Sequence, residues 1–180
     1  MTRALPDRIV TGRLVLREPR LSDAPALFEA YTQDAEVARY TVWRPHAALA
    51  ETQAFVERCV AMWAAGYEQS YVIVQRDHED RRMGMLAARV WGHTVDVGYV
   101  LARAYWRRGL MTEALRTVAE TVLAIPRFFR LQATCDVDNL ASARTLEKAG
   151  FVREGRLERY TTHPNLSAAP RASYMYARCR

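Results

Sequence analysis

The sequence predicts an α+β fold in which helices cover both faces of one mixed sheet. Three strand-like segments follow one another with only short polar turns between them, as in an antiparallel meander: Tyr71–Arg76, Met83–Trp91 and Thr94–Leu101. After residue 101 the pattern changes to alternating helix and strand, which is typical of a β-α-β unit. A meander that leads into such a unit gives a mostly antiparallel sheet with a parallel pair.

The elements before the meander are expected to be one strand and two helices. Arg13–Glu18 alternates apolar and polar residues and predicts a first strand. Ser22, Asp23 and a following proline signal the start of a helix that runs to about residue 31. A longer helix is predicted over Ala48–Ala65, where apolar residues recur at helical spacing and Gly66 ends the pattern.

The segments after the meander supply the β-α-β unit. They are a helix over Thr112–Ile125, a strand over Arg130–Asp136, a helix over Asn139–Ala149 and a strand from Phe151 onward. A proline follows the first helix and a glycine follows the second, which ends each of them. No repeat, low-complexity tract or linker interrupts the chain, so we expect one domain over residues 1–180.

The charge is spread unevenly along the chain. Residues 1–102 hold 12 basic and 13 acidic side chains, whereas residues 103–180 hold 14 and 7, with a net charge of +6 overall. The second half is therefore expected to bind an anion, and by charge alone nucleic acid, an acidic membrane surface and a small polyphosphate all fit. Neither the aromatic strand motif of an RNA reader nor a recognition-helix pattern is present, which argues against nucleic acid.

Other residue patterns bear on the location of the protein, the state of its thiols and metal binding. No stretch of about 18 apolar residues could span a bilayer and the polar N-terminus does not read as a signal peptide, so a cytoplasmic protein without membrane contact is expected. Cys59, Cys135 and Cys179 form no C-x-x-C pair and are interpreted as reduced thiols. The four histidines lack metal-ligand spacing and are interpreted as surface side chains in turns or loops; no metal site is predicted.

The segment after the third meander strand predicts an anion site. Arg107, Arg108 and Gly109 lead into a helix for which Thr112 is the expected cap. The first turn of a helix leaves backbone N–H groups free and carries partial positive charge, so a pyrophosphate fits there. The alternative is that Gly109 only shapes a tight turn and the arginines are solvated. The chain lacks G-x-x-x-x-G-K-[ST] and G-x-G-x-x-G, which disfavours nucleoside triphosphate and dinucleotide folds.

Two segments resemble a known family. Tyr105–Leu115, with the sequence YWRRGLMTEAL, resembles the loop that binds the CoA pyrophosphate in the GNAT superfamily, and Asn139–Gly155 resembles its second CoA-binding motif. Their form is closest to the RimJ/RimL-like branch, and the resemblance spans almost the whole chain. It implies a GNAT fold with a splayed parallel strand pair, acetyl-CoA as cosubstrate and transfer to a primary amine. The acceptor is then a protein N-terminus or a small amine, and the protein a monomer or homodimer.

The resemblance also implies roles for individual residues. The pyrophosphate would be bound by the backbone amides of Arg108, Gly109, Leu110, Met111 and Thr112. The side chains of Arg107 and Arg108 could reach further phosphates. The pantetheine arm would be bound along the strand by Val97, Gly98, Tyr99 and Val100, with Gly98 in a bulge that splays the strands. Asn139 would bind pantetheine or the substrate side, or cap its helix. Leu146 stands where many members of the family have a tyrosine acid and cannot donate a proton.

Acyl transfer needs a base, an oxyanion donor and a donor to the leaving sulfur. Asp96 is the candidate base, the alternative being a solvent-facing carboxylate. Ser142 is the candidate donor to the sulfur, the alternative being a cap of its own helix. The oxyanion donor is expected to be a backbone N–H near Tyr99 or Val100.

The acceptor side is expected to lie around the loop between the two early helices. Tyr40, Trp43 and Arg44 either shape an acceptor pocket or pack the loop. Residues 163–171 interrupt the last hairpin and are expected to cover that pocket. A different class of function stays open at this stage, namely a non-catalytic acyl-CoA sensor on the same fold.

Overall fold

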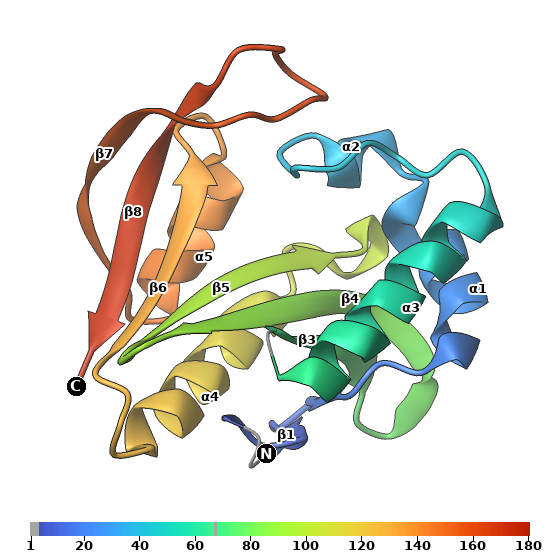
Figure 1. Cartoon of the computed structure of the whole chain (residues 1–180), viewed down its shortest axis with the longest axis horizontal. Coiled ribbons are helices and arrows are strands. Elements are labelled where there is room, and N and C mark those ends of the chain that lie inside the picture. The colour runs from blue at the N-terminus through green and yellow to red at the C-terminus, as the bar shows by residue number, and fades with distance from the viewer. Residues whose placement is uncertain (1–3, 67) are drawn as a thin grey trace.

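The computed structural model of the protein describes residues 4–66 and 68–180, and over these residues the chain forms one eight-stranded sheet (Figure 1). The strands lie in the order β1-β2-β3-β4-β5-β6-β8-β7. Their bounds are β1 Arg8–Val10, β2 Leu14–Arg17, β3 Glu68–Gln75, β4 His78–Trp91, β5 Thr94–Leu101, β6 Arg130–Asp136, β7 Val152–Thr161 and β8 Arg171–Cys179. Only β5 and β6 pair in parallel, and the other described pairs are antiparallel. The predicted α+β class is confirmed.

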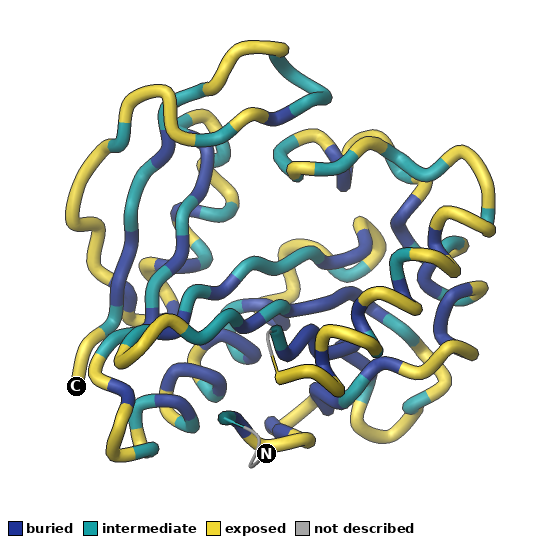
Figure 2. The backbone as a smooth tube through the Cα atoms, viewed as in Figure 1, coloured by how far each residue is buried: buried dark blue, intermediate teal, exposed yellow. Residues whose placement is uncertain are grey.

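Helices cover both faces of the sheet, as predicted. One face carries α4 (Leu110–Ala124) and α5 (Leu140–Lys148), and the other carries α1 (Ala24–Leu27) and α3 (Leu49–Ala65). The strands alternate between the two cores: Val72 and Val74 pack with α1 and α3, whereas Ile73 between them packs with the α4 side. The exposed edge strand β7 contrasts with the buried strands at the centre of the sheet (Figure 2).

The parallel pair is splayed. β5 and β6 pair only from Thr94 opposite Arg130 to Asp96 opposite Gln132. Beyond that point β5 stays paired with β4, and β6 stays paired with β8. The two strands therefore diverge toward their carboxyl ends, and Figure 1 shows the gap between their arrowheads.

The bulge predicted at Gly98 is absent, because β4 and β5 keep one register from Gly84 opposite Leu101 to Trp91 opposite Thr94. Gly98 has another reason to lack a side chain. A Cβ atom there would lie 3.2 Å from Nη2 of Arg89, the residue that reaches across this face of the sheet. The splay thus comes from the loss of β5–β6 pairing and not from an extra residue in β5.

The predicted elements differ from the structure mainly at their ends. β1 was not predicted, and β4 begins at His78 where a polar turn was expected, because its first residues are charged and largely exposed. The first predicted helix is divided into a 3-10 turn Leu21–Asp23, α1 and a π-helical turn Phe28–Thr32, followed by the short helix α2 (Ala35–Ala38). A further 3-10 turn, Arg103–Tyr105, precedes α4.

The helix cap expected at Thr112 was also placed wrongly. Gly109 is the N-cap of α4, with φ of 71°, and Thr112 is the third residue of the helix. The first intrahelical hydrogen bond runs from Glu113 N–H to the Gly109 carbonyl at 3.0 Å. A glycine adopts this left-handed conformation without the steric cost that other residues have, so the helix starts three residues earlier than side-chain capping suggests.

Candidate functional site

A cavity of about 340 Å³ lies where β5 and β6 diverge. β5 contributes Asp96 to Val100, β6 contributes Thr134 to Asp136, and α5 contributes Asn139 and Ser142. The other lining residues come from other parts of the chain: Tyr40, Thr41, Val42, Trp43, Phe55, Glu68, Ser70, Met85, Ala87, Arg89, Thr161, His163 and Ser173. The structure thus brings together most of the predicted strand and helix residues and adds several that were not predicted.

A hydroxyl pair stands on the α5 side of this cavity. The Tyr99 hydroxyl lies 2.7 Å from Ser142 Oγ, so the serine side chain does not cap its own helix. Burial raises the pKa of Tyr99 and outweighs the hydrogen bond to Ser142, so the phenol keeps its proton at neutral pH. Cys135 lies on the same wall, where burial raises the pKa of its thiol to about 11. The pair can donate a proton into the cavity, and the side chain of Tyr99 was not predicted in that role.

Asn139 caps α5. Its Oδ1 accepts a hydrogen bond from the backbone N–H of Ser142 at 3.1 Å. One of the two alternatives raised for this residue, the helix cap, is therefore present in the structure. The cap also fixes the first turn of α5, on which Ser142 is carried toward Tyr99.

The phase of the β4–β5 ladder decides which backbone groups face the gap. Ala102 N–H donates to the Met83 carbonyl at 2.7 Å, and these residues lie directly opposite each other. In an antiparallel ladder hydrogen-bonded pairs alternate, so even-numbered residues of β5 bond to β4. The N–H of Tyr99 consequently points toward the gap, whereas that of Val100 belongs to the ladder. Of the two candidates for an oxyanion donor, the register favours Tyr99.

The face of β5 opposite Tyr99 is acidic. Arg89 joins two carboxylates there, with Nη1 at 3.2 Å from Glu68 Oε2 and Nη2 at 3.1 Å from Asp96 Oδ1. Burial raises the pKa of Asp96, and the guanidinium of Arg89 and a hydrogen bond from Gln132 oppose that shift. Asp96 is a partly buried, paired carboxylate on the cavity wall, not a solvated surface charge.

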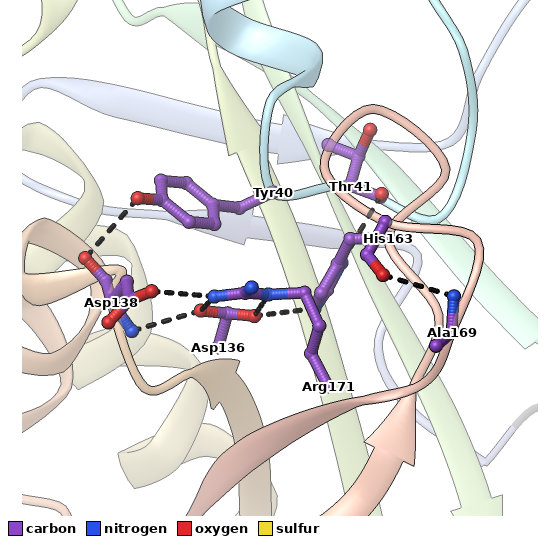
Figure 3. A network of polar contacts seen from close by, with 8 residues as sticks. Tyr40, Thr41, Asp136, Asp138, His163, Ala169 and Arg171 are labelled. Atoms are coloured by element: carbon purple, nitrogen blue, oxygen red, sulfur yellow. Dashed lines mark hydrogen bonds and ion pairs between the residues drawn. The ribbon is translucent and has the colours of Figure 1, made fainter.

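A second polar network, shown in Figure 3, includes the lining residues Asp136 and His163. Asp136, whose side chain is completely buried, accepts hydrogen bonds from Arg171 Nε at 2.6 Å and Nη2 at 3.1 Å, and from the N–H of Asp138 at 2.9 Å. Burial alone favours the neutral carboxyl, but Arg171 and the backbone donor outweigh it and lower the pKa of Asp136. Arg171 also pairs with Asp138 at 2.6 Å.

His163 belongs to the same network, and the surface position expected for it is wrong. The residue is only 5% exposed, with Nδ1 at 3.3 Å from the Thr41 carbonyl and Nε2 at 3.7 Å from Asp136 Oδ2. It is buried because residues 162–170 fold back onto the loop between α2 and α3. Such a contact leaves no trace in the spacing of the histidines along the sequence.

The segment after β7 packs on the loop that follows α2, and its residue His163 lines the cavity. Asn165 Nδ2 donates to the carbonyls of Ala38 at 2.6 Å and Trp43 at 2.8 Å, and Tyr40 donates to the Asp138 carbonyl at 3.3 Å. Tyr40 and Trp43 line the cavity. Arg44, which was grouped with them, is exposed and does not line it, because the chain turns away toward α3 after Trp43.

The loop before α4 presents backbone amides and two exposed arginines. Arg107 has φ of 62°, and both Arg107 and Arg108 are exposed. The N–H groups of Leu110, Met111 and Thr112 precede the first intrahelical hydrogen bond, so they lack partners within the helix. This arrangement fits a pyrophosphate, which needs several converging donors.

Two unpredicted side chains hold this loop. Arg13 donates from Nη1 to the Arg108 carbonyl at 3.1 Å and pairs through Nε with Glu113 Oε2 at 2.7 Å. Glu113 also accepts from Thr11 Oγ1 at 2.6 Å. The turn between β1 and β2 therefore fixes the start of α4 and neutralises a carboxylate close to the proposed anion site.

Within residues 4–66 and 68–180, no group of three or more His, Cys, Asp or Glu side chains is arranged to hold a metal ion. In the same part of the chain no helix is both long and apolar enough to cross a membrane.

Comparison with known proteins identifies the family. Residues 13–152 match the model of the acetyltransferase (GNAT) domain. The chain is 31% identical over 151 residues to the N-acetyltransferase YnaD of Bacillus subtilis, which covers 82% of this chain and 84% of that protein. A GNAT-family acetyltransferase from Bacillus anthracis matches with a TM-score of 0.82 at 25% identity, over 96% of this chain and 98% of that one. RimJ of Mycobacterium smegmatis, in complex with CoA-disulfide, has the same fold, with a TM-score of 0.85 at 22% identity over 99% and 90% of the chains. The chain therefore belongs to the GNAT family of acetyltransferases.

Proposed function

We propose that the protein transfers the acetyl group of acetyl-CoA directly to a primary amine inside the central cavity. The observation that carries this proposal is that one cavity, between the diverging strands, joins a proton-donating hydroxyl pair to a wall of carboxylates. The hydroxyl pair can donate a proton to the leaving sulfur of a thioester, and the carboxylates attract a protonated amine, so the two reactants can meet between them.

The CoA side is proposed to bind through backbone. The pyrophosphate lies at the amides of Arg108 to Thr112, with the side chains of Arg107 and Arg108 close to its charge. The pantetheine arm lies along β5 from Val97 to Val100, where the ladder leaves the N–H and carbonyl groups of alternate residues unpaired. RimL in complex with coenzyme A and the microcin C7 self-immunity acetyltransferase MccE in complex with acetyl-CoA share the fold and support this choice of ligand.

The transfer itself is proposed to use three groups of the cavity wall. The N–H of Tyr99 stabilises the oxyanion that forms when the amine attacks the thioester carbon. Ser142, backed by the Tyr99 hydroxyl, donates to the sulfur as the carbon–sulfur bond breaks. Asp96 attracts the acceptor ammonium and is one candidate for the base that removes its proton.

The acceptor is proposed to be the α-amino group of a peptide or protein. RimL, one of the neighbours in fold, is described as a ribosomal L7/L12 α-N-protein acetyltransferase, which favours this class. Glu68, Asp96 and Asp136 supply negative charge around the cavity, and a protonated N-terminus complements it. Small amines complement it equally well and form the second acceptor class.

A thiol-release assay tests the proposal. Purified protein is incubated with acetyl-CoA and a panel that contains short peptides with varied N-terminal residues and several small amines, and free CoA is measured. Release that depends on a peptide supports the proposed acceptor, and release with small amines alone replaces it. Tight CoA binding with no release across the panel would instead support a sensor that binds acyl-CoA without turnover.

A further inference from the structure

The floor of the central cavity changes from charged to apolar along the strands. Residues that lie opposite each other on β3, β4 and β5 point to the same face of the sheet and form rows across it. One of them, the charged row, consists of Glu68, Arg89 and Asp96. Another, the apolar row, contains Met85 and Val100. All five residues line the cavity, so its floor has one charged end and one apolar end.

Small residues form the row between these two ends. Ser70 lies opposite Ala87, and Ala87 lies opposite Gly98. A Cβ atom on Gly98 would lie 3.2 Å from Nη2 of Arg89, so the guanidinium of the charged row reaches toward this position. Because the side chains of the middle row are small, the floor leaves room for a ligand that contacts both ends.

Two aromatic side chains complete the apolar end. Trp43 and Phe55 line the cavity, are half-buried and pack on the core that contains Met85. His46 contacts both rings, with its centroid 5.6 Å from that of Trp43 and 6.2 Å from that of Phe55. Burial lowers the pKa of His46, so the imidazole brings no charge to this end at neutral pH. Apolar surface that stays open in a cavity favours an apolar ligand group over water.

We infer that the acceptor is a peptide whose first residue carries a large apolar side chain, such as leucine, methionine or phenylalanine. This inference rests on the proposed function, because it names the class of peptide that would bind in the same cavity. The α-ammonium lies at the charged row, where two carboxylates outnumber one guanidinium. The first side chain lies on the apolar row beside Trp43 and Phe55.

The spacing of the two rows fits this class of residue. Asp96 and Val100 are four residues apart on β5, which corresponds to about 14 Å between their Cα atoms in an extended strand. The side chain of Arg89 shortens the interval from the charged end. A large first residue can contact the charged row with its nitrogen and the apolar row with its side chain. Alanine or serine leaves Met85 and Val100 uncovered, and a charged first side chain would lose its hydration there.

A panel of peptides with the wild-type protein tests the inference first. The peptides differ only in their first residue, with leucine, methionine and phenylalanine set against alanine, serine and glutamate, and release of CoA from acetyl-CoA gives the rates. We expect kcat/KM to be about tenfold higher for the large apolar residues than for alanine or serine. An equal or opposite order overturns the inference and leaves the proposed function standing, because the peptides are still acetylated.

The variant Phe55→Ala tests whether the preference comes from the apolar end of the cavity. It should lower kcat/KM for the leucine peptide about tenfold and leave the value for the alanine peptide unchanged. Met62→Ala is the matched control, because Met62 is an exposed apolar residue of the same helix and does not line the cavity. Equal losses with both peptides in a folded Phe55→Ala protein overturn the inference. If this variant does not fold, the wild-type panel decides alone.

The acyl chain of a longer donor is the competing occupant of the apolar end. Hexanoyl-CoA in place of acetyl-CoA separates the two, and we expect acetyl-CoA to give the higher kcat/KM. A preference for hexanoyl-CoA would place the acyl chain on Met85 and Val100 and overturn the inference. Absence of release with every acceptor and either donor overturns the proposed function, and the inference with it.

Discussion

The two sides of the central cavity are built in different ways. The proposed CoA side comes from one continuous run, from β5 through the loop to the start of α4, of which β5 lines the cavity, and it offers mainly backbone groups. The proposed acceptor side is assembled from side chains of the 40–43 loop, β3, β4 and the end of β6, together with Thr161, His163 and Ser173. A ligand that every member of the family shares can be held by backbone, whereas an acceptor that differs between members is recognised by side chains that can change.

The charges differ in the same way. On the CoA side two exposed arginines surround free amides, so an anion can approach from solvent. On the acceptor side each carboxylate is tied to a guanidinium, and the network is partly or fully buried. Substitutions on the first side should therefore change binding of CoA, and those on the second should change catalysis and acceptor use. The following variants test this division.

The largest effect in this series is expected for Ser142→Ala. Removing the hydroxyl leaves the departing sulfur without its donor, so kcat should fall about 100-fold while CoA affinity is kept. Tyr99→Phe should have a similar effect, and the double variant should be little worse than either single one, because the two hydroxyls act as a unit 2.7 Å apart. Initial rates of thiol release give these values. Additive losses in the double variant would show that the two hydroxyls act independently.

Asp96→Asn separates attraction of the acceptor from removal of its proton. With the negative charge gone, we expect KM for the acceptor to rise about tenfold and the affinity for CoA to stay the same. Rate profiles against pH make the measurement, with the exposed Glu158→Gln as control. A profile that loses its acidic limb in Asp96→Asn would make Asp96 the base.

A smaller effect is expected on the CoA side from Arg108→Glu. Reversing an exposed charge beside the pyrophosphate should weaken CoA binding about fivefold, a difference of about 1 kcal/mol. Titration calorimetry measures it, and Arg81→Glu on β4 is an exposed control away from the loop. An acetyl thioester of N-acetylcysteamine, which has no pyrophosphate, should be used equally well by the variant and the wild type. Equal losses for both thioesters would exclude a contact with phosphate.

The fold was accessible from the sequence because its signals are local. Alternation and turn residues located the three central strands, and glycine and proline marked where the later helices end. The elements whose position was predicted wrongly or not at all depend on backbone conformation or on pairing with distant segments. A left-handed Gly109 starts α4 before any capping side chain, and β1 is a strand only because β2 lies beside it.

The residues of the site also divide into those with local sequence signals and those that depend on tertiary contacts. The run from Val97 to Thr112 could be located because it is contiguous and resembles a family motif. The burial of His163 depends on Asn165 reaching the carbonyls of Ala38 and Trp43, more than 100 residues away along the chain. The contact of Arg13 with Arg108 joins residues that lie 95 positions apart. Contacts of this kind leave no periodicity or spacing that a single sequence displays.

The smallest effect, and the one that tests the border between the two sides, is expected for Asn139→Ala. Loss of the cap on α5 should lower the free energy of unfolding by about 1 kcal/mol, since the Ser142 N–H loses its acceptor. Asn139→Asp keeps an acceptor at the N-terminus of the helix and should retain the stability. Denaturant unfolding measures both, and thiol release measures whether Ser142 keeps its place. A loss of activity in Asn139→Ala far beyond the change in stability, matched by an equal loss in Asn139→Asp, would show that the Asn139 amide itself contacts a substrate. The proposed CoA side of the cavity would then extend to the start of α5.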